Sequence, residues 1–484
     1  MLFNSYIFIL AFLPLCLLGY FLLNKFENKN YAQAFLLAMS LWFYGYFNLY
    51  YLIIIIASIL INFFLYKGIE KNRGRVAGKA LMITGVAANL CILGYFKYTD
   101  FFISTVNGVF KTNIPLLHIL LPLGISFFTF QQVSFIVDAY RGEVPKYGFI
   151  GYASFVAFFP QLIAGPIVTH DELVPQFLDN EKKKFNPDNV AAGLFMFSLG
   201  LSKKVLVADT FSDVVSYAYV APERLNTLSA WIIILSYTLQ IYFDFSGYCD
   251  MAIGIAKMFN IDIPINFNSP YKASTIAEFW DRWHMTLTRF FTKYLYIPLG
   301  GNRKGTFRTY LNVFIVFLAS GFWHGAGWTF IVWGILHGLF MLINRAGKKQ
   351  IDKIPFFLKW PVTFLFINLS WVFFRAPSLP VAFQIIKTAF SFTKGPLDPI
   401  IANAFRIKEI SDVLSVIDLE NHFPNIIMTG FFTVVLGITF FAPNSHTLLK
   451  KFKPNVLTLL LTAFLFIWSF LSISGVSEFL YFNF

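Results

Sequence analysis

LSAWIIILSYTLQIYFDFSGYCDMAIGIAK, residues 228–257, is an apolar run in which only Asp244, Asp250 and Lys257 carry charge. A helix needs about 20 apolar residues to cross the hydrocarbon core of a bilayer. Only a helix or a closed β-barrel can satisfy its backbone polar groups in that core. The run therefore predicts a membrane-spanning helix.

Similar apolar runs recur along the whole chain and predict an all-α polytopic membrane protein. None of them shows the alternation of about ten residues that is typical of barrel strands. We expect a bundle of about ten to twelve transmembrane helices. The other candidate spans are residues 6–23, 35–66, 80–96, 115–137, 149–168, 189–208, 310–343, 358–374, 425–442 and 456–476.

The composition agrees with this class. The chain has 484 residues, of which 57% are hydrophobic and 13% charged, whereas soluble domains have roughly 25% charged residues. A net charge of +13 is explained by lysines and arginines that gather in cytoplasmic loops, so no nucleic-acid partner is expected. Cys16, Cys91 and Cys249 lie in apolar runs without paired spacing, so neither a disulfide framework nor a metal site is predicted.

Basic loops suggest an orientation. The loop 67–79 carries five lysines and arginines against one glutamate, which favours the cytoplasmic side. The loop 24–34 carries two lysines against one glutamate, a weaker signal for the same side. The run 35–66 must then cross twice and turn near Asn48. We expect one integral-membrane domain over 1–484.

Within that domain, we expect three regions and two segments that are too polar to span. The regions are N-terminal helices over 1–140, a catalytic core over 149–343 and C-terminal helices over 344–484. The polar segments are 169–188 and about 378–424, and the second is long enough for a surface helix or a docking site.

Two histidines are the leading candidates for chemistry. His284 and His324 lie in apolar surroundings, where an ionisable side chain indicates a functional site. The alternative for each is a structural hydrogen bond between helices. The residues around His324 are small, namely Ser320, Gly321, Gly325 and Gly327. They allow close helix packing, and they would also clear a narrow passage for an acyl or pantetheine group.

Neighbours at helical spacing suggest supporting roles. Asp281 would lie one turn before His284 and could orient its ring, although a solvated surface carboxylate is an equal alternative. Trp283 and Trp323 could stack on substrate or anchor the chain at the membrane interface. His337 lies thirteen residues beyond His324, off its helical face, and is interpreted as structural.

A basic segment follows His284. Its cationic residues are explained by positive-inside bias, or they could capture a phosphate-bearing donor. The candidate donor-binding residues are Arg282, Arg289, Arg303 and Lys304. Within the 228–257 run, Asp244 and Asp250 could form a proton pathway or a buried polar network, and we favour the network.

The chain resembles the membrane-bound O-acyltransferase family, in particular its alginate and peptidoglycan O-acetyltransferase types. The resemblance rests on FFPQLIAGPI (158–167), GLSKKVLVAD (200–209), LQIYFDFSGYCDMAIGIAKMF (239–259), NFNSPYKASTIAEFWDRWHMTLTRFF (266–291), YLYIPLGGNRKG (294–305), SGFWHGAGWTFIVWGILHG (320–338) and FLYFNF (479–484). Thr292-Lys293 departs from the Arg-Asp pair that members often have ahead of YxYIPLGG.

The resemblance implies helices around a central funnel, with His324 as the catalytic histidine at its floor and His284 as the second polar position. It implies a multi-pass enzyme of the bacterial inner membrane that moves acetyl from a cytoplasmic thioester, acetyl-CoA, to an extracytoplasmic polysaccharide. Peptidoglycan, alginate and other exopolysaccharides remain open as acceptors. No permanently bound cofactor is expected, and a periplasmic SGNH-type acetyltransferase or esterase is the expected partner.

Two other functions compete with this one. A transporter or flippase for a lipid-linked or polymeric substrate would need intramembrane charges along a path, and Asp244 and Asp250 partly fit. A non-catalytic subunit that anchors a periplasmic enzyme is the third possibility. Replacing His324 should abolish acetylation only if the chain is the enzyme.

Overall fold

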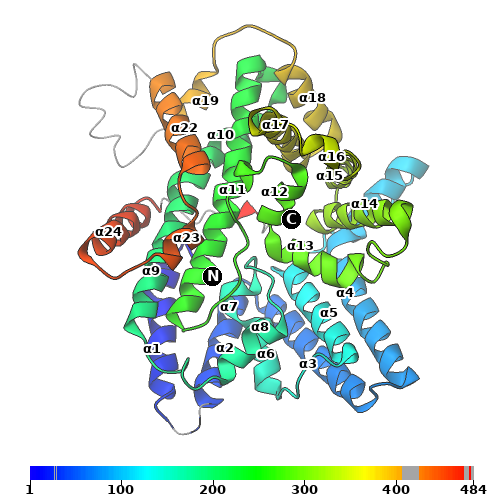
Figure 1. The fold of residues 1–484 in the computed structure, drawn as a ribbon, viewed down its shortest axis with the longest axis vertical. Coiled ribbons are helices and arrows are strands. Elements are labelled where there is room, and N and C mark those ends of the chain that lie inside the picture. The colour runs from blue at the N-terminus through cyan, green and yellow to red at the C-terminus, as the bar shows by residue number, and fades with distance from the viewer. Residues whose placement is uncertain (27, 29, 406–423, 474–478, 481–484) are drawn as a thin grey trace. The chain divides into compact units, whose positions relative to one another are not determined.

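The computed structural model describes residues 1–484 except 27, 29, 406–423, 474–478 and 481–484. Every regular element among the described residues is a helix, as predicted (Figure 1). Within that part of the chain, seven helices are long and apolar enough to cross a membrane: Leu49–Lys71, Val76–Phe110, Pro187–Val220, Thr227–Met258, Trp328–Ala346, Phe356–Arg375 and Pro424–Phe441. The all-α multi-pass class is confirmed, whereas the full number of passes and the central funnel stay predictions.

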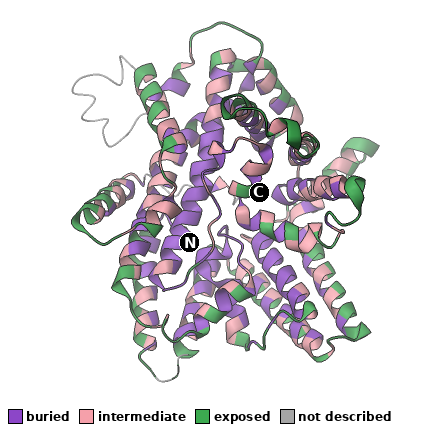
Figure 2. Ribbon diagram, in the orientation of Figure 1, coloured by how far each residue is buried: buried purple, intermediate pink, exposed green. Residues whose placement is uncertain are grey.

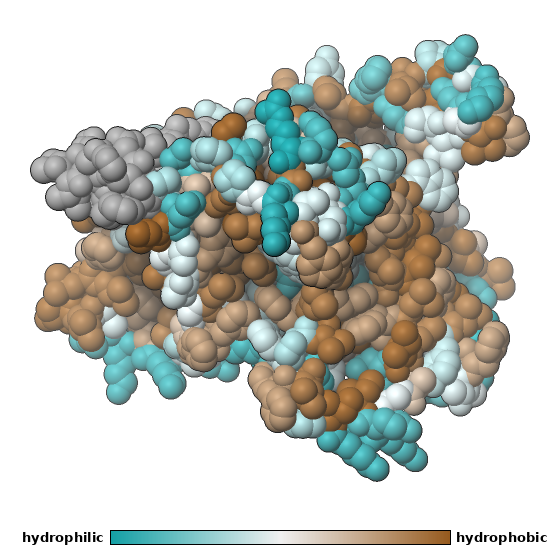
Figure 3. All heavy atoms as spheres, turned by 90° about the horizontal axis from the view of Figure 1, so that it is seen from above, coloured by the Kyte–Doolittle hydropathy of each residue, from teal (hydrophilic) through white to brown (hydrophobic). Residues whose placement is uncertain are grey.

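Two compact units are described separately below. The first comprises Met1–Phe197 and Met251–Pro264, and the second comprises Ser198–Asp250 and Ile265–Leu480. The expected single domain with its three regions stays a prediction. Broad hydrophobic areas are visible on the molecular surface (Figure 3), as a membrane-covered protein requires.

The first unit contains the N-terminal helices. They are η1 (Phe8–Phe12), α1 (Leu13–Leu23), α2 (Asn30–Gly45), α3 (Leu49–Lys71), α4 (Val76–Phe110), α5 (Ile125–Arg141), α6 (Phe149–Ala157), α7 (Phe159–Leu162), α8 (His170–Leu178) and the start of α9 (Pro187–Ser202). The turn predicted near Asn48 is confirmed, because the Asn48 side chain accepts the Tyr50 N–H at 2.8 Å and begins α3. α1, α2 and α3 pack in sequence order, so the end of α1 and the end of α3 lie on the same side of this unit (Figure 1).

Two predicted spans of the first unit differ in the structure. The span expected over 115–137 begins only at Ile125, after Gly124, whose φ of +71° suits a residue without a side chain. The run 149–168 breaks at Phe158 into α6 and α7, and Pro160 lies in the first turn of α7, where a helix tolerates proline. The polar segment 169–188 contains the short helix α8, whose N-terminus is capped by Thr169 and Glu172.

The second unit is built around the first part of α11 (Thr227–Met258). The most apolar window of α11 is 78% buried, compared with 22% for α4, and α11 is mostly purple in Figure 2. The remaining elements are η2 (Lys203–Ala208), α10 (Asp209–Val220), η3 (Pro222–Arg224), η4 (Pro270–Lys272), α12 (Ile276–Arg282), α13 (Met285–Phe291), η5 (Thr292–Tyr296), α14 (Gly305–His324), α15 (Trp328–Ala346), α16 (Lys348–Ile351), α17 (Phe356–Arg375), α18 (Leu379–Ala389), α19 (Pro399–Asn403), α22 (Pro424–Phe441), α23 (Ser445–Lys450) and α24 (Val456–Leu471).

The run 310–343, expected as one span, is a helical hairpin. α14 ends at His324, the backbone is extended at Gly325 and Gly327, and α15 follows. The predicted small-residue contact is formed within this hairpin, because a Cβ on Gly321 would lie 2.5 Å from the Phe330 carbonyl oxygen and 3.0 Å from the Gly334 Cα. The hairpin therefore depends on glycine at position 321.

The segment predicted as polar, 378–424, is described only in part. It contains α18 and α19, while its residues 406–423 lie outside the described residues. The last four residues of the FLYFNF motif, 481–484, also lie outside them. The suggestion of a docking site in 378–424 stays a prediction.

Candidate active site

His324 is the last residue of α14, and its side chain is enclosed by aromatic rings. The residue is 2% exposed. Its ring centroid lies 4.8 Å from that of Trp323, and 5.1 Å from those of Trp333 and Phe374. The glycines after His324 end the helix there, so the imidazole lies at the bend of the hairpin.

His284 lies at a break between α12 and α13. Trp283 is extended and His284 has a φ of +46°, a left-handed conformation that is uncommon for a non-glycine residue. The side chain is fully buried. The helical spacing expected between Asp281 and His284 is therefore wrong. The sequence pattern gave no sign of this break.

The Asn266 carboxamide contacts the His284 ring. Asn266 Oδ1 lies 3.1 Å from His284 Nδ1 and also accepts the Thr286 N–H at 3.2 Å and the Thr286 hydroxyl at 2.8 Å. Because the atom that accepts these donors is an oxygen, Nδ1 of His284 must donate. A neutral His284 ring therefore carries its proton on Nδ1, and Nε2 is its basic nitrogen.

The structure brings the two histidines together from distant parts of the second unit. The ring centroids of His284 and His324 are 6.3 Å apart, and the planes are inclined by 55°. Trp323 borders both rings, with its centroid 6.1 Å from that of His284. Two imidazoles in one buried aromatic pocket can bind, hold and exchange a proton, which is the requirement for general acid–base chemistry.

Of the residues predicted to support His284, Trp283 lies in the buried aromatic surroundings and Asp281 does not. Trp283 is fully buried and stacks on Phe279 at 5.5 Å, which contradicts its alternative as an interface anchor. Asp281 is exposed on the other side of the helix break, so the helical spacing that suggested its contact with His284 does not exist. Asn266 occupies the position that the sequence analysis assigned to Asp281.

His337 supports the structure, as predicted. The indole N–H of Trp280 donates to His337 Nδ1 at 3.2 Å, and His337 Nε2 lies 3.0 Å from the Ser370 hydroxyl. Since Nδ1 accepts, the neutral ring carries its proton on Nε2 and donates to Ser370. Both nitrogens are therefore used to join α12, α15 and α17.

Arg282, in the basic segment, has an acidic partner. Arg282 Nη2 lies 2.7 Å from Glu278 Oε1. Burial by itself would raise the pKa of Glu278. The hydrogen bonds from Ser274 and the charge of Arg282 together outweigh burial, so the pKa lies below its usual value. Arg289, Arg303 and Lys304 are exposed, and the donor-binding role of the segment stays a prediction.

The turn after η5 is anchored by a residue that the sequence analysis missed. Gly300 and Gly301 have φ of +109° and +53°, conformations that favour glycine. The Asn312 side chain, fully buried on α14, donates to the Gly301 carbonyl at 2.9 Å. An asparagine within an apolar run was the available signal.

The buried aspartates of α11 form ion pairs. Lys204 Nζ lies 2.6 Å from Asp244 and 2.9 Å from Asp209. Lys203 Nζ lies 2.6 Å from Asp250. These contacts support the predicted polar network, and the adjacent lysines of GLSKKVLVAD were its sequence signal.

Comparison with known proteins decides the family. Residues 138–381 match the model of the membrane-bound O-acyltransferase family. The chain belongs to this family. His284, His324 and all the other proposed site residues lie within the matched segment.

Similar proteins include enzymes named for acyl transfer to peptidoglycan, alginate and teichoic acid. The chain is 42% identical to a peptidoglycan O-acetyltransferase of Helicobacter pylori, over 100% of this chain and 98% of that protein. It is 41% identical to a probable alginate O-acetylase of Pseudomonas aeruginosa, over 81% and 75% of the two chains. A teichoic acid D-alanyltransferase of Streptococcus thermophilus is 30% identical over 48% of this chain and 59% of that protein.

Membership in this family selects among the predicted functions. The chain is an O-acyltransferase and a multi-pass membrane protein. The family therefore favours acyl chemistry over transport without acyl transfer. The ion pairs of Asp244 and Asp250 with lysines also remove the main sequence argument for a transporter, which was two unpaired charges in the membrane.

Proposed function

We propose that this chain transfers acetyl groups from cytoplasmic acetyl-CoA to hydroxyl groups of peptidoglycan outside the bacterial inner membrane. The observation that carries the proposal is the pair of buried imidazoles, His284 and His324, 6.3 Å apart within the family segment. The peptidoglycan acceptor is favoured over alginate because the full-length relative is a peptidoglycan O-acetyltransferase.

The reaction needs a base and no redox change. The acceptor hydroxyl oxygen forms a bond to the thioester carbonyl carbon, and the carbon–sulfur bond breaks. His324 takes the hydroxyl proton and returns it to the departing thiolate, so that an ester and free CoA are formed. His284 assists through Nε2, because Asn266 holds the proton on Nδ1.

Acetyl transfer to the polymer is proposed to finish on a periplasmic SGNH-type partner. The acetyl donor is made in the cytoplasm, whereas the acceptor lies outside, so the membrane chain must pass the acetyl between them. A partner whose hydroxyl takes up the acetyl, with His324 as the base, would also supply the polymer-binding surface. The relatives' names refer to polysaccharides, and the partner follows only from the resemblance.

Reconstitution tests this proposal. The purified chain is placed in proteoliposomes with labelled acetyl-CoA on one side and peptidoglycan fragments or alginate on the other, with and without the periplasmic partner. We expect CoA release that depends on His324 and label on peptidoglycan in preference to alginate. Full activity of the His324→Ala variant, or label on alginate alone, would contradict the catalytic or the acceptor assignment respectively.

A further inference from the structure

A groove on the first unit lies apart from the histidines. It runs along α1 and is closed on its other side by residues 180–185, and its volume is about 860 Å³. This volume lies within the range of about 300–1,000 Å³ that is usual for small-ligand pockets. It can hold a single lipid-sized molecule, and it is too small for a folded partner.

The α1 wall of the groove is apolar. Leu17, Leu18, Phe21 and Leu22 line it. Leu18 is 59% exposed and Leu22 is 46% exposed, which is costly in water and natural where lipid covers the surface. A hydrocarbon chain lying along this wall would bury both leucines.

The mouth of the groove is cationic. Lys25, Lys183 and Lys184 belong to its lining, and the described lining residues include no carboxylate. Glu181, next to the lining, bonds to Lys184 at 2.7 Å and offsets one charge. The excess of positive charge at one end, beside an apolar wall, is complementary to a molecule with an anionic head and an apolar tail.

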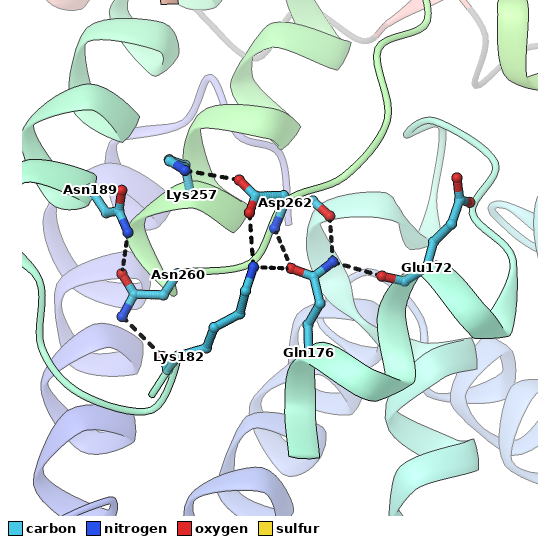
Figure 4. Close-up of polar contacts among 7 residues, drawn as sticks. All are labelled: Glu172, Gln176, Lys182, Asn189, Lys257, Asn260 and Asp262. Carbon is cyan, nitrogen blue, oxygen red and sulfur yellow. Dashed lines mark hydrogen bonds and ion pairs between the residues drawn. The ribbon is translucent and has the colours of Figure 1, made fainter. Parts of the chain in front are cut away.

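Hydrogen bonds hold the lysine side of the groove in place. The Asn260 side chain donates to the Lys182 carbonyl at 2.9 Å and accepts from Asn189 at 2.9 Å (Figure 4). It also donates to the Lys184 carbonyl at 2.6 Å. Asn260 has a left-handed backbone, with φ of +63°. These bonds fix the backbone on either side of Lys183.

An ion-pair cluster adds a second attachment to the same segment. Lys182 lies 2.8 Å and Lys257 2.9 Å from Asp262 (Figure 4). Lys182 is therefore committed to Asp262, while Lys183 and Lys184 line the groove. Phe185 also contacts Phe21 of α1, with ring centroids 5.3 Å apart. The groove is thus formed before any ligand arrives.

We infer that this groove is a binding site for an anionic phospholipid. One acyl chain lies along Leu17, Leu18 and Leu22, and the phosphate lies at Lys183, Lys184 and Lys25. Lys25 lies just beyond the end of α1, which shares its side of this unit with the basic end of α3 (Figure 1). Basic ends face the cytoplasm, which places the headgroup in the cytoplasmic leaflet, where anionic lipids are abundant.

Lipid titration tests the site. The purified full-length protein is titrated with phosphatidylglycerol and with phosphatidylcholine of the same acyl chains, and bound lipid is counted by native mass spectrometry. We expect phosphatidylglycerol to bind about tenfold more tightly, because its net negative headgroup is attracted by three lysines whose charge Glu181 offsets only in part. Equal binding of the two lipids would overturn the inference.

Matched variants locate the lipid. Lys183→Gln with Lys184→Gln should remove the preference for phosphatidylglycerol. Lys348→Gln with Lys349→Gln, an exposed adjacent pair elsewhere, should leave the preference unchanged. Equal loss in both double variants would show general surface charge and overturn the site.

Two further experiments distinguish binding of a whole lipid from binding of its headgroup alone. Leu18→Trp fills the apolar wall from an exposed position and should weaken both lipids. Glycerol 3-phosphate should fail to displace phosphatidylglycerol at similar concentrations. An unchanged Leu18→Trp variant, or displacement by glycerol 3-phosphate, would overturn the assignment to a lipid. No acetyl donor is present, so the result is independent of the proposed transferase activity.

Discussion

The region around His284 and His324 and the region around Lys203 and Lys204 both bury ionisable side chains in the second unit, but they do so differently. Lys204 and Asp244 are 3% and 2% exposed at their side chains and lie 2.6 Å apart. His284 and His324 are buried to the same degree and are surrounded by aromatic rings and the Asn266 carboxamide. The lysine region pairs opposite charges, whereas the histidine region contains imidazoles that can be neutral.

This difference indicates function. A buried lysine and aspartate that neutralise each other are held in one protonation state, and breaking such a pair is costly. A buried imidazole is neutral at rest, because a lasting charge among aromatic rings is costly. It can still take up and release a proton during a reaction, since the free imidazole titrates near neutral pH. The lysine region is therefore suited to holding helices together, and the histidine region is suited to moving a proton.

The largest effect is expected at His324. His324→Ala should lower acetyl transfer by about 10²–10⁴-fold, the usual contribution of a general base, while its cavity should lower thermal stability no more than His337→Ala does. His337→Ala is the matched control, because it removes a buried histidine bonded to Trp280 and Ser370 and should mainly lower stability. Equal loss of activity in two equally stable variants would remove the distinction between these histidines.

The second effect tests the lysine region. Lys204→Met should lower the free energy of unfolding by about 3–5 kcal/mol, because Asp244 would be left as an uncompensated buried charge. Removing Asp244 as well, as leucine, should restore much of the loss. Unfolding in detergent measures both variants. Lys67→Met, at the half-buried surface pair with Glu70, should change stability by less than about 1 kcal/mol.

A smaller effect is expected from the residue that orients His284. Asn266→Ala should lower kcat by roughly tenfold while KM changes little, because the ring loses the acceptor that keeps its proton on Nδ1. Thr286→Val keeps the Asn266–His284 contact and should retain most of the activity. If both variants lose only thermal stability, Asn266 has a structural role. The contact between Asn266 and His284 would then hold the fold together, as the lysine–aspartate pairs do.

The smallest effect concerns the exposed ion pairs of the first unit. Burial raises the pKa of Asp262, but hydrogen bonds from Lys182 and Lys257 lower it below its usual value. A carboxyl whose folded pKa is depressed stabilises the fold above its unfolded pKa, about 3.9, and the contribution is lost as pH falls through the folded pKa.

Asp262→Asn measures that contribution. The variant should be less stable than the parent by less than about 1 kcal/mol near pH 7, since solvent screens these pairs. The difference should persist down to about pH 5 and vanish at lower pH as Asp262 protonates. Unfolding curves of both proteins between pH 3 and 8 give the comparison. A difference that grows on acidification would contradict the assigned ion pairs.

Parts of the fold and site were predictable from local patterns. Apolar run lengths predicted the helical spans, and the turn at Asn48 followed from the length of the run 35–66. The hairpin at Gly325–Gly327 was missed because its two helices are equally apolar, so hydropathy shows no boundary. The break at His284 was missed because a left-handed backbone there depends on packing against Asn266 and the rings around it.

The amino-acid sequence by itself determined that the chain spans a membrane as helices. In lipid, an apolar segment has few other ways to form hydrogen bonds with all its backbone polar groups. The sequence also marked His284 and His324 as unusual. Tertiary structure alone decided that these two imidazoles meet and that Asn266 orients one of them. It likewise decided that Asp244 and Asp250 are neutralised by lysines some 40 or more residues away. Side-chain meetings at such separations depend on how helices pack, which no local pattern of residues records.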